Sequence, residues 1–266
     1  MINIAVLGVS GRMGRCLVRA IRESEDLSLS GALASPESGS LGHDAGEVAQ
    51  AGPVAIEVTS DRGRALANAA IAIDFTLPEA TADNLAAVAS RQIPIVIGTT
   101  GLDAERHALI RRVSEKLPVL VAPNMSLAVN LFFSLVGSAA AALPADYDIE
   151  IVDAHHRHKA DAPSGTALRL GEIAAGARDT TLGNVGVYGR AGRATARSPG
   201  AIGFSSVRAG DIIGEHHVLF AGSGETLELV HRATDRMTFA YGALAAARWL
   251  RGRQPGLYGM SDVLGV

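Results

Sequence analysis

The side chains best suited to acid–base chemistry are concentrated between His155 and Lys159 of the 266-residue sequence. This segment reads His-His-Arg-His-Lys, a density of cationic and titratable groups that core packing does not require. Histidine donates a proton readily near neutral pH, because its unperturbed pKa is about 6.5. The segment therefore predicts a histidine general acid with positive charge beside it.

The residues that follow this segment add a place for an anion. The run Pro-Ser-Gly-Thr, residues 163–166, opens a stretch with helical spacing of apolar residues. Ser164 is a favoured N-cap, and Gly165 permits a ligand to approach the backbone closely. The N–H groups at such a helix start favour an anion. The basic segment and the helix start together suit a small substrate that carries carboxylates.

Two alternatives to catalysis remain for the histidines. A basic surface strand without chemistry would have the same composition, and His155, His156 and His158 could ligate a metal. We expect no metal site, because the single cysteine lies far away in sequence and no carboxylate–histidine helical motif accompanies the histidines. A later segment is by itself more typical of a solvated hairpin, with its histidines satisfied by hydrogen bonds, than of a catalytic element. Its polar residues are Asp211, Glu215, His216 and His217.

A glycine motif near the start of the sequence indicates a second kind of chemistry. It follows the strand-like run INIAVL and opens a helical pattern near Arg12. Its glycines allow a tight turn and close backbone approach, while the helix start offers N–H groups to a pyrophosphate. The spacing is GxxGxxG rather than the commoner GxGxxG, and glycines that serve only a tight turn are the alternative. The expected dinucleotide contacts are Gly8, Val9, Ser10, Gly11, Arg12 and Met13.

The preferred cofactor depends on the position about 20 residues after the last glycine, where an acidic side chain usually binds the adenosine ribose. Ala34 and Ser35 occupy it here, so no carboxylate competes with the 2′-phosphate of NADPH. Arg12 could supply positive charge to that phosphate, whereas Glu37 could reach the ribose of NADH. We therefore expect NADPH or NADH to be used, with a preference for NADPH.

Two further motifs follow apolar strand-like runs. The carboxyl ends of strands in an open parallel sheet are where ligands bind, so these motifs are expected to flank the nicotinamide. Ordinary loops whose threonine and serine side chains cap helices are the alternative. The residues are Gly98, Thr99 and Thr100 in the first motif and Ala122, Pro123, Asn124 and Met125 in the second.

The elements that must position these residues follow from the apolar pattern. In the first half, the runs INIAVL, LSLSGAL, IAIDFT, IPIVIG and PVLVA alternate with helix-spaced segments. This alternation predicts an α/β, Rossmann-like, doubly wound parallel sheet. After Ala145, strand-like runs joined by Gly-rich turns surround one helix near residues 164–177, which predicts an α+β part with an open mixed sheet. The stretch MTFAYGALAAARWL predicts a helix that returns to the first sheet.

Composition and charge exclude several classes of protein. The 24 Lys and Arg residues against 27 Asp and Glu residues give a net charge of -3, without the positive field that nucleic acid requires. The single cysteine allows no internal disulfide, which fits a reducing cytoplasm. Residues 117–145 carry no charge, but Pro123 and the polar residues beside it split this span into a strand and a helix. We therefore expect a cytoplasmic globular protein with neither a nucleic-acid nor a membrane partner.

The chain resembles the 4-hydroxy-tetrahydrodipicolinate reductase family, also called dihydrodipicolinate reductase. The resemblance covers nearly the whole chain and rests on seven ordered motifs: GVSGRMG, IDFTLPE, IVIGTTG, APNMS, EIVDAHHRHKADAPSGTA, VRAGDIIGEH and RMTFAYGA. The string HHRHKxDAPSGTA is its most specific part. The resemblance implies NAD(P)H-dependent reduction of a small cyclic dicarboxylate, with loss of water, to tetrahydrodipicolinate on the diaminopimelate route to lysine. It also implies a cytoplasmic homotetramer.

The resemblance implies roles for individual residues as well. His155 would be the general acid with Lys159 as its partner, and the substrate carboxylates would be held by His156, Gly165 and Thr166. The family often has an acidic–basic pair in place of Ala34 and Ser35 and an aromatic residue in place of Met125. The implied domains are residues 1–126 with 236–266 for the dinucleotide, and 127–235 for substrate binding and tetramerisation.

Two rival functions fit parts of the sequence. A non-catalytic nucleotide sensor would need the glycine motif but has no use for the histidine segment. An amino-acid dehydrogenase of similar two-domain build, such as one acting on aspartate, would not accept the cyclic dicarboxylate. Substrate profiling separates the three functions, because a sensor turns over nothing.

Overall fold

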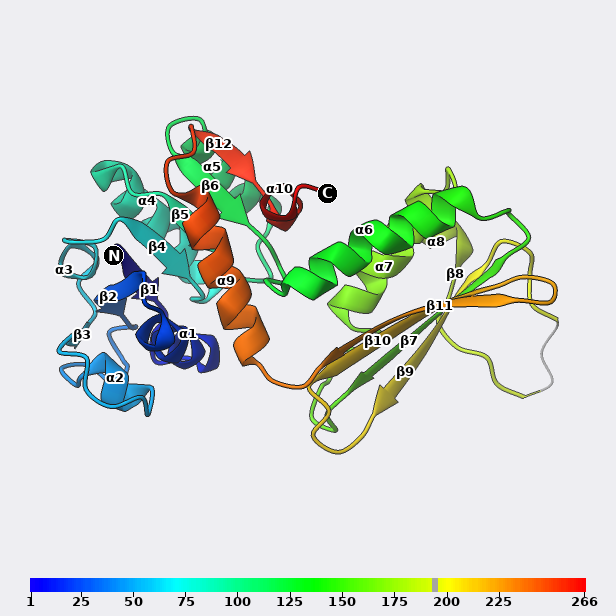
Figure 1. The fold of residues 1–266 in the computed structure, drawn as a ribbon, viewed down its shortest axis with the longest axis horizontal. Coiled ribbons are helices and arrows are strands. Elements are labelled where there is room, and N and C mark those ends of the chain that lie inside the picture. Colours follow the sequence, from blue (N-terminus) through cyan, green and yellow to red (C-terminus); the bar gives the residue numbers. More distant parts are fainter. Residues whose placement is uncertain (193–195) are drawn as a thin grey trace. The chain divides into compact units, whose positions relative to one another are not determined.

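Two compact units divide the chain. The first comprises Met1–Leu127 and Arg236–Val266, and the second comprises Ala128–Asp235. The computed structural model describes residues 1–192 and 196–266. Each unit has its own sheet (Figure 1). Each unit also has its own apolar core.

The first unit is built on a seven-stranded sheet in which all neighbouring strands are parallel. The strand order is β12-β6-β5-β4-β1-β2-β3. Strands β2 and β3 are added on one side of β1, and β4, β5 and β6 are added on its other side, so the strand order reverses at β1. Such a reversal opens a crevice at the carboxyl ends of the strands. The predicted Rossmann-like sheet is confirmed. Its strands are β1 (Ile2–Leu7), β2 (Leu27–Leu33), β3 (Val58–Thr59), β4 (Ile71–Asp74), β5 (Ile95–Ile97), β6 (Pro118–Val121) and β12 (Gly256–Tyr258).

Helices complete the first unit. One core cluster joins β1 and β6 to α1 and α9, and the other joins β5 to α4 and α5. Helix α9 is the predicted MTFAYGALAAARWL helix, and it packs so closely that a Cβ on Gly242 would lie 1.8 Å from the Met125 carbonyl oxygen. The helices are α1 (Arg12–Glu23), α2 (Ala45–Val48), α3 (Arg62–Ala65), η1 (Pro78–Ala80), α4 (Thr81–Arg91), α5 (Ala104–Ser114), α9 (Met237–Leu250) and α10 (Met260–Leu264).

The second unit has a five-stranded mixed sheet of order β11-β10-β7-β9-β8. Strands β7 and β9 are parallel, whereas β10 is antiparallel to both β7 and β11, which confirms the predicted mixed sheet. Helices α6 and α7 cover one face, as Figure 1 shows, and share a core with it. The elements are α6 (Leu127–Ala142), β7 (Asp148–His155), α7 (Gly165–Gly176), α8 (Leu182–Val185), β8 (Gly186–Val187), β9 (Ile202–Arg208), β10 (Gly214–Ala221) and β11 (Thr226–Ala233).

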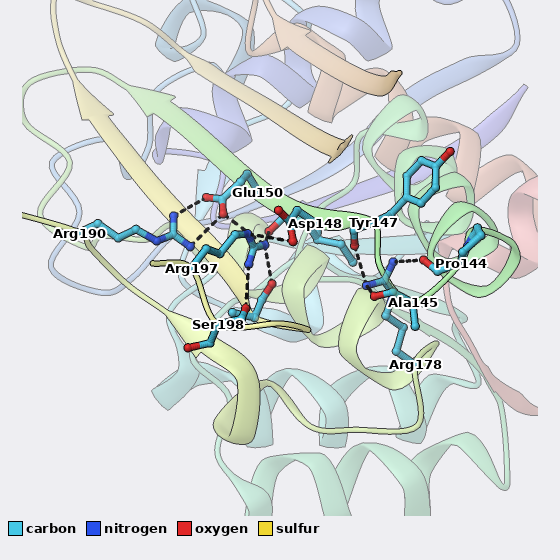
Figure 2. Close-up of polar contacts among 11 residues, drawn as sticks. Pro144, Ala145, Tyr147, Asp148, Glu150, Arg178, Arg190, Arg197 and Ser198 are labelled. Atoms are coloured by element: carbon cyan, nitrogen blue, oxygen red, sulfur yellow. Dashed lines mark hydrogen bonds and ion pairs between the residues drawn. The ribbon is translucent and has the colours of Figure 1, made fainter. Parts of the chain in front are cut away.

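Three arginines of the second unit donate hydrogen bonds to residues at or just before the start of β7 (Figure 2). Arg190 donates from both terminal nitrogens to the Glu150 carboxylate, at 3.0 Å each. Arg197 donates to the Ile149 and Ala201 carbonyl oxygens, and Arg178 donates to backbone carbonyls that follow α6.

None of the helices in residues 1–192 and 196–266 combines the length and the apolar character that a membrane-spanning helix needs.

Candidate active site

His155 is the last residue of β7 and is buried. Side chains of a strand alternate between its faces, so residues 153 and 155 point to the same side. The His155 Nδ1 atom lies 3.1 Å from Oδ2 of Asp153, whose residue is only 1% exposed. An ionised carboxylate can only accept hydrogen bonds, so Nδ1 carries the hydrogen and Nε2 is the nitrogen left to meet a substrate.

Asp153 is ionised because its neighbours supply both charge and hydrogen bonds. Ser206 Oγ donates to Oδ1 at 2.6 Å, and Arg208 Nη1 donates to Oδ2 at 2.9 Å. Both donors are on β9, whose parallel register sets Ser206 opposite Asp153 and Arg208 opposite His155. Burial alone would raise the pKa of Asp153, but the hydrogen bonds from His155, Ser206 and Arg208 outweigh it and hold that pKa well below its ordinary value.

A second buried histidine stands beside this pair. His216 on β10 is 4% exposed, and its ring meets that of His155 edge to face, with centroids 5.2 Å apart. Its Nε2 shares a hydrogen bond of 3.1 Å with the Ser164 hydroxyl. Burial first, and then the proximity of His155, lowers the pKa of His216 to about 3. His216 is therefore uncharged at neutral pH.

The solvated-hairpin interpretation of the later segment is thus wrong for His216. Residues of β10 alternate between buried and half-buried, so His216 faces inward with Val218, while Glu215 and His217 face outward. His217 Nε2 lies 3.7 Å from the Glu215 carboxylate, and both side chains are partly exposed. Only these two outward residues behave as a solvated hairpin would.

The loop after β7 connects the remaining basic residues to this group. Lys159 Nζ lies 2.8 Å from the Asp161 carboxylate, which lowers the pKa of Asp161. Arg208 Nη2 donates to the Asp161 carbonyl oxygen at 2.6 Å, so one guanidinium contacts both this loop and Asp153. His156 and His158 lie beside each other in the loop, with ring centroids 6.3 Å apart.

The start of α7 has the predicted cap. Ser164 is the N-cap residue, and its hydroxyl accepts a hydrogen bond from the Ala167 N–H at 3.2 Å. A Cβ on Gly165 would meet no atom within 4 Å, so packing does not require glycine there and room for a ligand is present. Thr166 follows in the first turn. The second unit thus combines His155, Lys159 and a helix start in one buried and partly buried group.

The histidines of this group are held by hydrogen bonds and ring contacts. Asp153 binds His155, and Ser164 binds His216. Within residues 1–192 and 196–266, no set of three histidine, cysteine, aspartate or glutamate side chains is arranged to hold a metal ion.

The glycine motif of the first unit forms a tight cradle at the end of β1. Gly8 has a φ of +88°, and a Cβ there would lie 2.7 Å from the Phe75 carbonyl oxygen. A Cβ on Gly14 would lie 2.2 Å from the Gly8 carbonyl oxygen. Gly11 is the N-cap of α1 and offers no side-chain hydrogen bond to the first turn. Backbone N–H groups at such a helix start suit the pyrophosphate of a dinucleotide.

A cavity of about 620 Å³ opens beside this cradle, a size ordinary for small-molecule sites. Five of the expected cofactor residues line it: Gly8, Ser10, Gly11, Ala34 and Ser35. Val9, Arg12 and Met13 are not part of the lining. Val9 is buried, Arg12 is exposed at the start of α1, and Met13 packs against the core. Other lining residues follow the ends of β3 and β4 or lie in α3, η1 and α4. They include Ser60, Phe75 and Thr76 from the strand ends and Arg62, Glu79 and Asn84 from the helices.

The other expected cofactor residues lie at the ends of two adjacent strands, β5 and β6. The Ala122 N–H donates to the Ile97 carbonyl oxygen at 3.1 Å, which joins the two motifs. Thr99, Ala122 and Met125 are buried, and Asn124 Oδ1 accepts a hydrogen bond from the Ser126 N–H at 2.9 Å. Gly98 lies against the Phe75 ring, which a Cβ would approach to 2.3 Å.

Residues without an assigned role in the sequence form a hydrogen-bonded network at the wall of the cavity. Asp74 ends β4 and accepts hydrogen bonds from Thr76 at 2.7 Å and Asn84 at 3.0 Å. Burial raises the pKa of Asp74 despite these hydrogen bonds. Asn84 in turn accepts a hydrogen bond from Arg62 Nε at 2.9 Å. The signal that could have found Asp74 is a carboxylate at the carboxyl end of a strand-like run.

Comparison with known proteins covers both units. Residues 2–125 match the family described as "Dihydrodipicolinate reductase, N-terminus", and residues 128–264 match "Dihydrodipicolinate reductase, C-terminus". A 4-hydroxy-tetrahydrodipicolinate reductase of Nitrosomonas europaea is 49% identical over 265 residues, 100% of this chain and 98% of that protein. One of Thiobacillus denitrificans is 50% identical over 265 residues, 100% and 99% of the two chains.

A solved structure is similar over the same extent. It is a dipicolinate-bound dihydrodipicolinate reductase from Paenisporosarcina sp. TG-14, with a TM-score of 0.80 and 26% sequence identity. The similarity covers 98% of this chain and 99% of that one.

Proposed function

Since this chain belongs to the dihydrodipicolinate reductase family, we propose that it reduces 4-hydroxy-tetrahydrodipicolinate to tetrahydrodipicolinate, with loss of water, in lysine and diaminopimelate biosynthesis. It is a pyridine-nucleotide-dependent oxidoreductase. The observation that carries the proposal is the match of both units to the family, together with the buried Asp153–His155 pair in the most specific motif. In this function the first unit is the dinucleotide domain and the second is the substrate and tetramerisation domain.

The residues of the first unit fit a bound dinucleotide. A Cβ at Gly8 or Gly14 would collide with neighbouring backbone, so both glycines are required for the tight turn from β1 into α1. Support for a pyrophosphate comes from the N–H groups at the start of α1 and from the cavity that Gly8, Ser10 and Gly11 line. NADPH or NADH bound there supplies a hydride. The pyrophosphate contacts are assigned to the backbone from Gly8 to Met13, and Ala34 and Ser35 meet the adenosine ribose. The nicotinamide end is assigned to Gly98, Thr99, Thr100, Ala122, Pro123, Asn124 and Met125.

His155 is the proton donor in this proposal. Hydride addition to a conjugated imine leaves electron density that must be protonated. Because Nδ1–H is bound to Asp153, His155 donates from Nε2 as the imidazolium, and transfer of that proton to the substrate leaves the neutral ring with its hydrogen on Nδ1. Asp153 acts as a positioning residue that fixes the ring and its tautomer, and Ser206 and Arg208 hold Asp153 in place. Lys159 supplies the charge that stabilises the developing anion.

The substrate carboxylates are assigned to His156, Gly165 and Thr166. Support comes from the start of α7, a helix of 12 residues whose first N–H groups favour an anion. The open space beside Gly165 is consistent with a ligand lying against the backbone. The solved relative is described as dipicolinate-bound, which agrees with a dicarboxylate site in the family.

The proposed function is tested by following nicotinamide oxidation with the substrate generated in situ by its synthase. Oxidation that depends on the synthase, with NADPH or NADH, is the expected result. If folded protein binds nucleotide but oxidises neither cofactor, the nucleotide-sensor function replaces this one. Oxidation linked to aspartate instead of the cyclic dicarboxylate would indicate the amino-acid dehydrogenase.

A homotetramer in the cytoplasm is part of the same proposal. The face of the five-stranded sheet opposite α6 and α7 carries apolar side chains, among them Val207 at 44% and Val230 at 41% exposure. Val152, His217 and Val230 stand in one row across β7, β10 and β11. Such a face is suited to pack on another subunit. Light scattering at micromolar concentration is expected to give the mass of four chains, and a monomer mass would contradict the assignment.

A further inference from the structure

Arg62 is a cation in the lining of the cavity beside the glycine cradle. Ala34 and Ser35, in the same lining, stand where an acidic residue usually binds the adenosine ribose. We propose that Arg62, with Ser35 and Ser60, binds the 2′-phosphate of NADPH and sets the preference for that cofactor. This proposal rests on the proposed function only in so far as the cavity holds a nicotinamide dinucleotide. All three residues line the cavity.

The strand pairing brings these residues to one place. Strands β2 and β3 are parallel, with Leu33 opposite Thr59, and the Ala34 N–H donates to the Thr59 carbonyl oxygen at 3.0 Å. Ser35 and Ser60 follow directly after these paired positions. The end of the second strand is where a Rossmann sheet meets the adenosine ribose. The end of β3 therefore flanks the same ribose, and Arg62 comes three residues after that end.

The Arg62 guanidinium is held from one side by a buried amide. Its Nε donates to Asn84 Oδ1 at 2.9 Å, and Asn84 is fully buried and bound to Asp74. Its Nη2 lies 3.2 Å from Asp83, whose side chain is 71% exposed, while that of Arg62 is 34% exposed. An ion pair with so exposed a carboxylate is weak, so a phosphate dianion competes with it readily.

The other charged groups near the cavity are less suited to this role. Among the described residues that line it, Glu79 on η1 is the carboxylate that remains, and Glu37 is exposed and not part of the lining. Arg12 is exposed and also outside the lining. Arg64, two residues after Arg62, is already paired with both oxygens of Glu57, at 3.2 and 2.9 Å. Arg62 is thus the cation that the cavity presents beside Ser35.

The test uses two fragments that differ only in the phosphate, adenosine 2′,5′-bisphosphate and adenosine 5′-monophosphate, in titration calorimetry with the full chain. Wild-type protein is expected to bind the bisphosphate about tenfold or more tightly than the monophosphate. Arg62→Ala is expected to weaken bisphosphate binding about tenfold to a hundredfold, and monophosphate binding less than about threefold. Arg64→Ala is the matched control and is expected to change neither affinity.

Three results overturn the proposal: a wild-type ratio of the two affinities near one, an Arg62→Ala ratio equal to the wild-type ratio, or loss of the ratio in Arg12→Ala alone. If Arg62→Ala does not fold, Arg62→Lys keeps the charge without the Asn84 contact and is expected to retain part of the ratio; a full loss would overturn the proposal. The synthase-coupled reaction of wild-type protein with NADH reports on the proposed function separately. Failure of that reaction with an intact fragment ratio would leave Arg62 in place and remove the proposed function.

Discussion

His155 and His216 lie edge to face on neighbouring antiparallel strands, with ring centroids 5.2 Å apart, yet their environments differ in kind. His155 is bound to the ionised carboxylate of Asp153, whereas His216 is bound to the uncharged hydroxyl of Ser164. The pKa of His216 is lowered to about 3, so this ring adds no positive charge beside His155 at neutral pH. The pair therefore combines one ring bound to a charged carboxylate with one uncharged ring bound to a hydroxyl.

His155→Ala is expected to lower kcat about a hundredfold to ten-thousandfold, because general acid catalysis contributes that much. The dissociation constant of NADPH should stay within about twofold, since His155 belongs to the second unit and the glycine cradle to the first. Steady-state kinetics and titration calorimetry measure the two effects. His158→Ala, an exposed histidine of the same segment, is the control and should keep most of its activity. An unchanged kcat in His155→Ala would remove this residue from the mechanism.

Asp153→Asn is expected to lower kcat at least about tenfold with little change in KM, because an amide no longer requires the Nδ1–H tautomer of His155. Asp153→Glu should restore part of the rate, since a carboxylate returns. The pH–rate profile should change in Asp153→Asn and recover in Asp153→Glu, which a purely structural role would not produce. Asp148→Asn, an ion-paired carboxylate at the other end of β7, is the control. A wild-type profile in Asp153→Asn would show that the carboxylate does not position His155.

Lys159→Ala is expected to raise KM and lower kcat, each about tenfold or more, because a cation lost from a dicarboxylate site affects ground and transition states together. Lys116→Ala removes an exposed lysine of the first unit and serves as the control. Initial rates over a range of substrate concentrations separate the two parameters. An effect confined to the affinity for the dinucleotide would refute the placement of Lys159 at the substrate.

Local patterns in the sequence were sufficient for the elements that bear most of the site. The glycine motif predicted a helix near Arg12, and α1 begins there. The cap residue Ser164 predicted the helix that starts at Gly165. The short elements β3, α2, α3 and β12 were not predicted, because two to four residues carry no readable periodicity. Two of these elements, β3 and α3, bring Ser60 and Arg62 to the cavity.

The network around His155 required information that no local pattern contains. Ser206 and Arg208 reach Asp153 only because β7 and β9 pair in parallel with a particular register. The burial of His216 follows from strand alternation along β10, which separates two adjacent histidines onto opposite faces. The sequence predicts one strand-like run, DIIGEHHVLFA, and side-chain alternation along that run would have indicated this division. Contacts across such pairings depend on chain segments about 50 residues apart, beyond the range of periodicity.

Acidification is expected to destabilise the protein through His216. The folded pKa of this ring is about 3 against about 6.5 in the unfolded chain, so between these values the unfolded state binds the proton and the folded state does not. Stability is therefore fully present above pH 6.5 and is lost as the pH falls towards 3. Burial lowers the pKa of His231 as well, which adds to the loss in the same direction.

From pH 7 to pH 5, His216 alone should reduce the free energy of unfolding by about 2 kcal/mol. Urea denaturation followed by far-UV circular dichroism at the two pH values measures this loss. His216→Asn removes the titrating ring, so its loss between pH 7 and pH 5 should be smaller than that of wild-type protein by about 2 kcal/mol, whatever its absolute stability. His217→Asn, one position along β10 and partly exposed, should keep the wild-type dependence. Equal losses in wild-type protein and His216→Asn would mean that His216 does not stay neutral in the folded state.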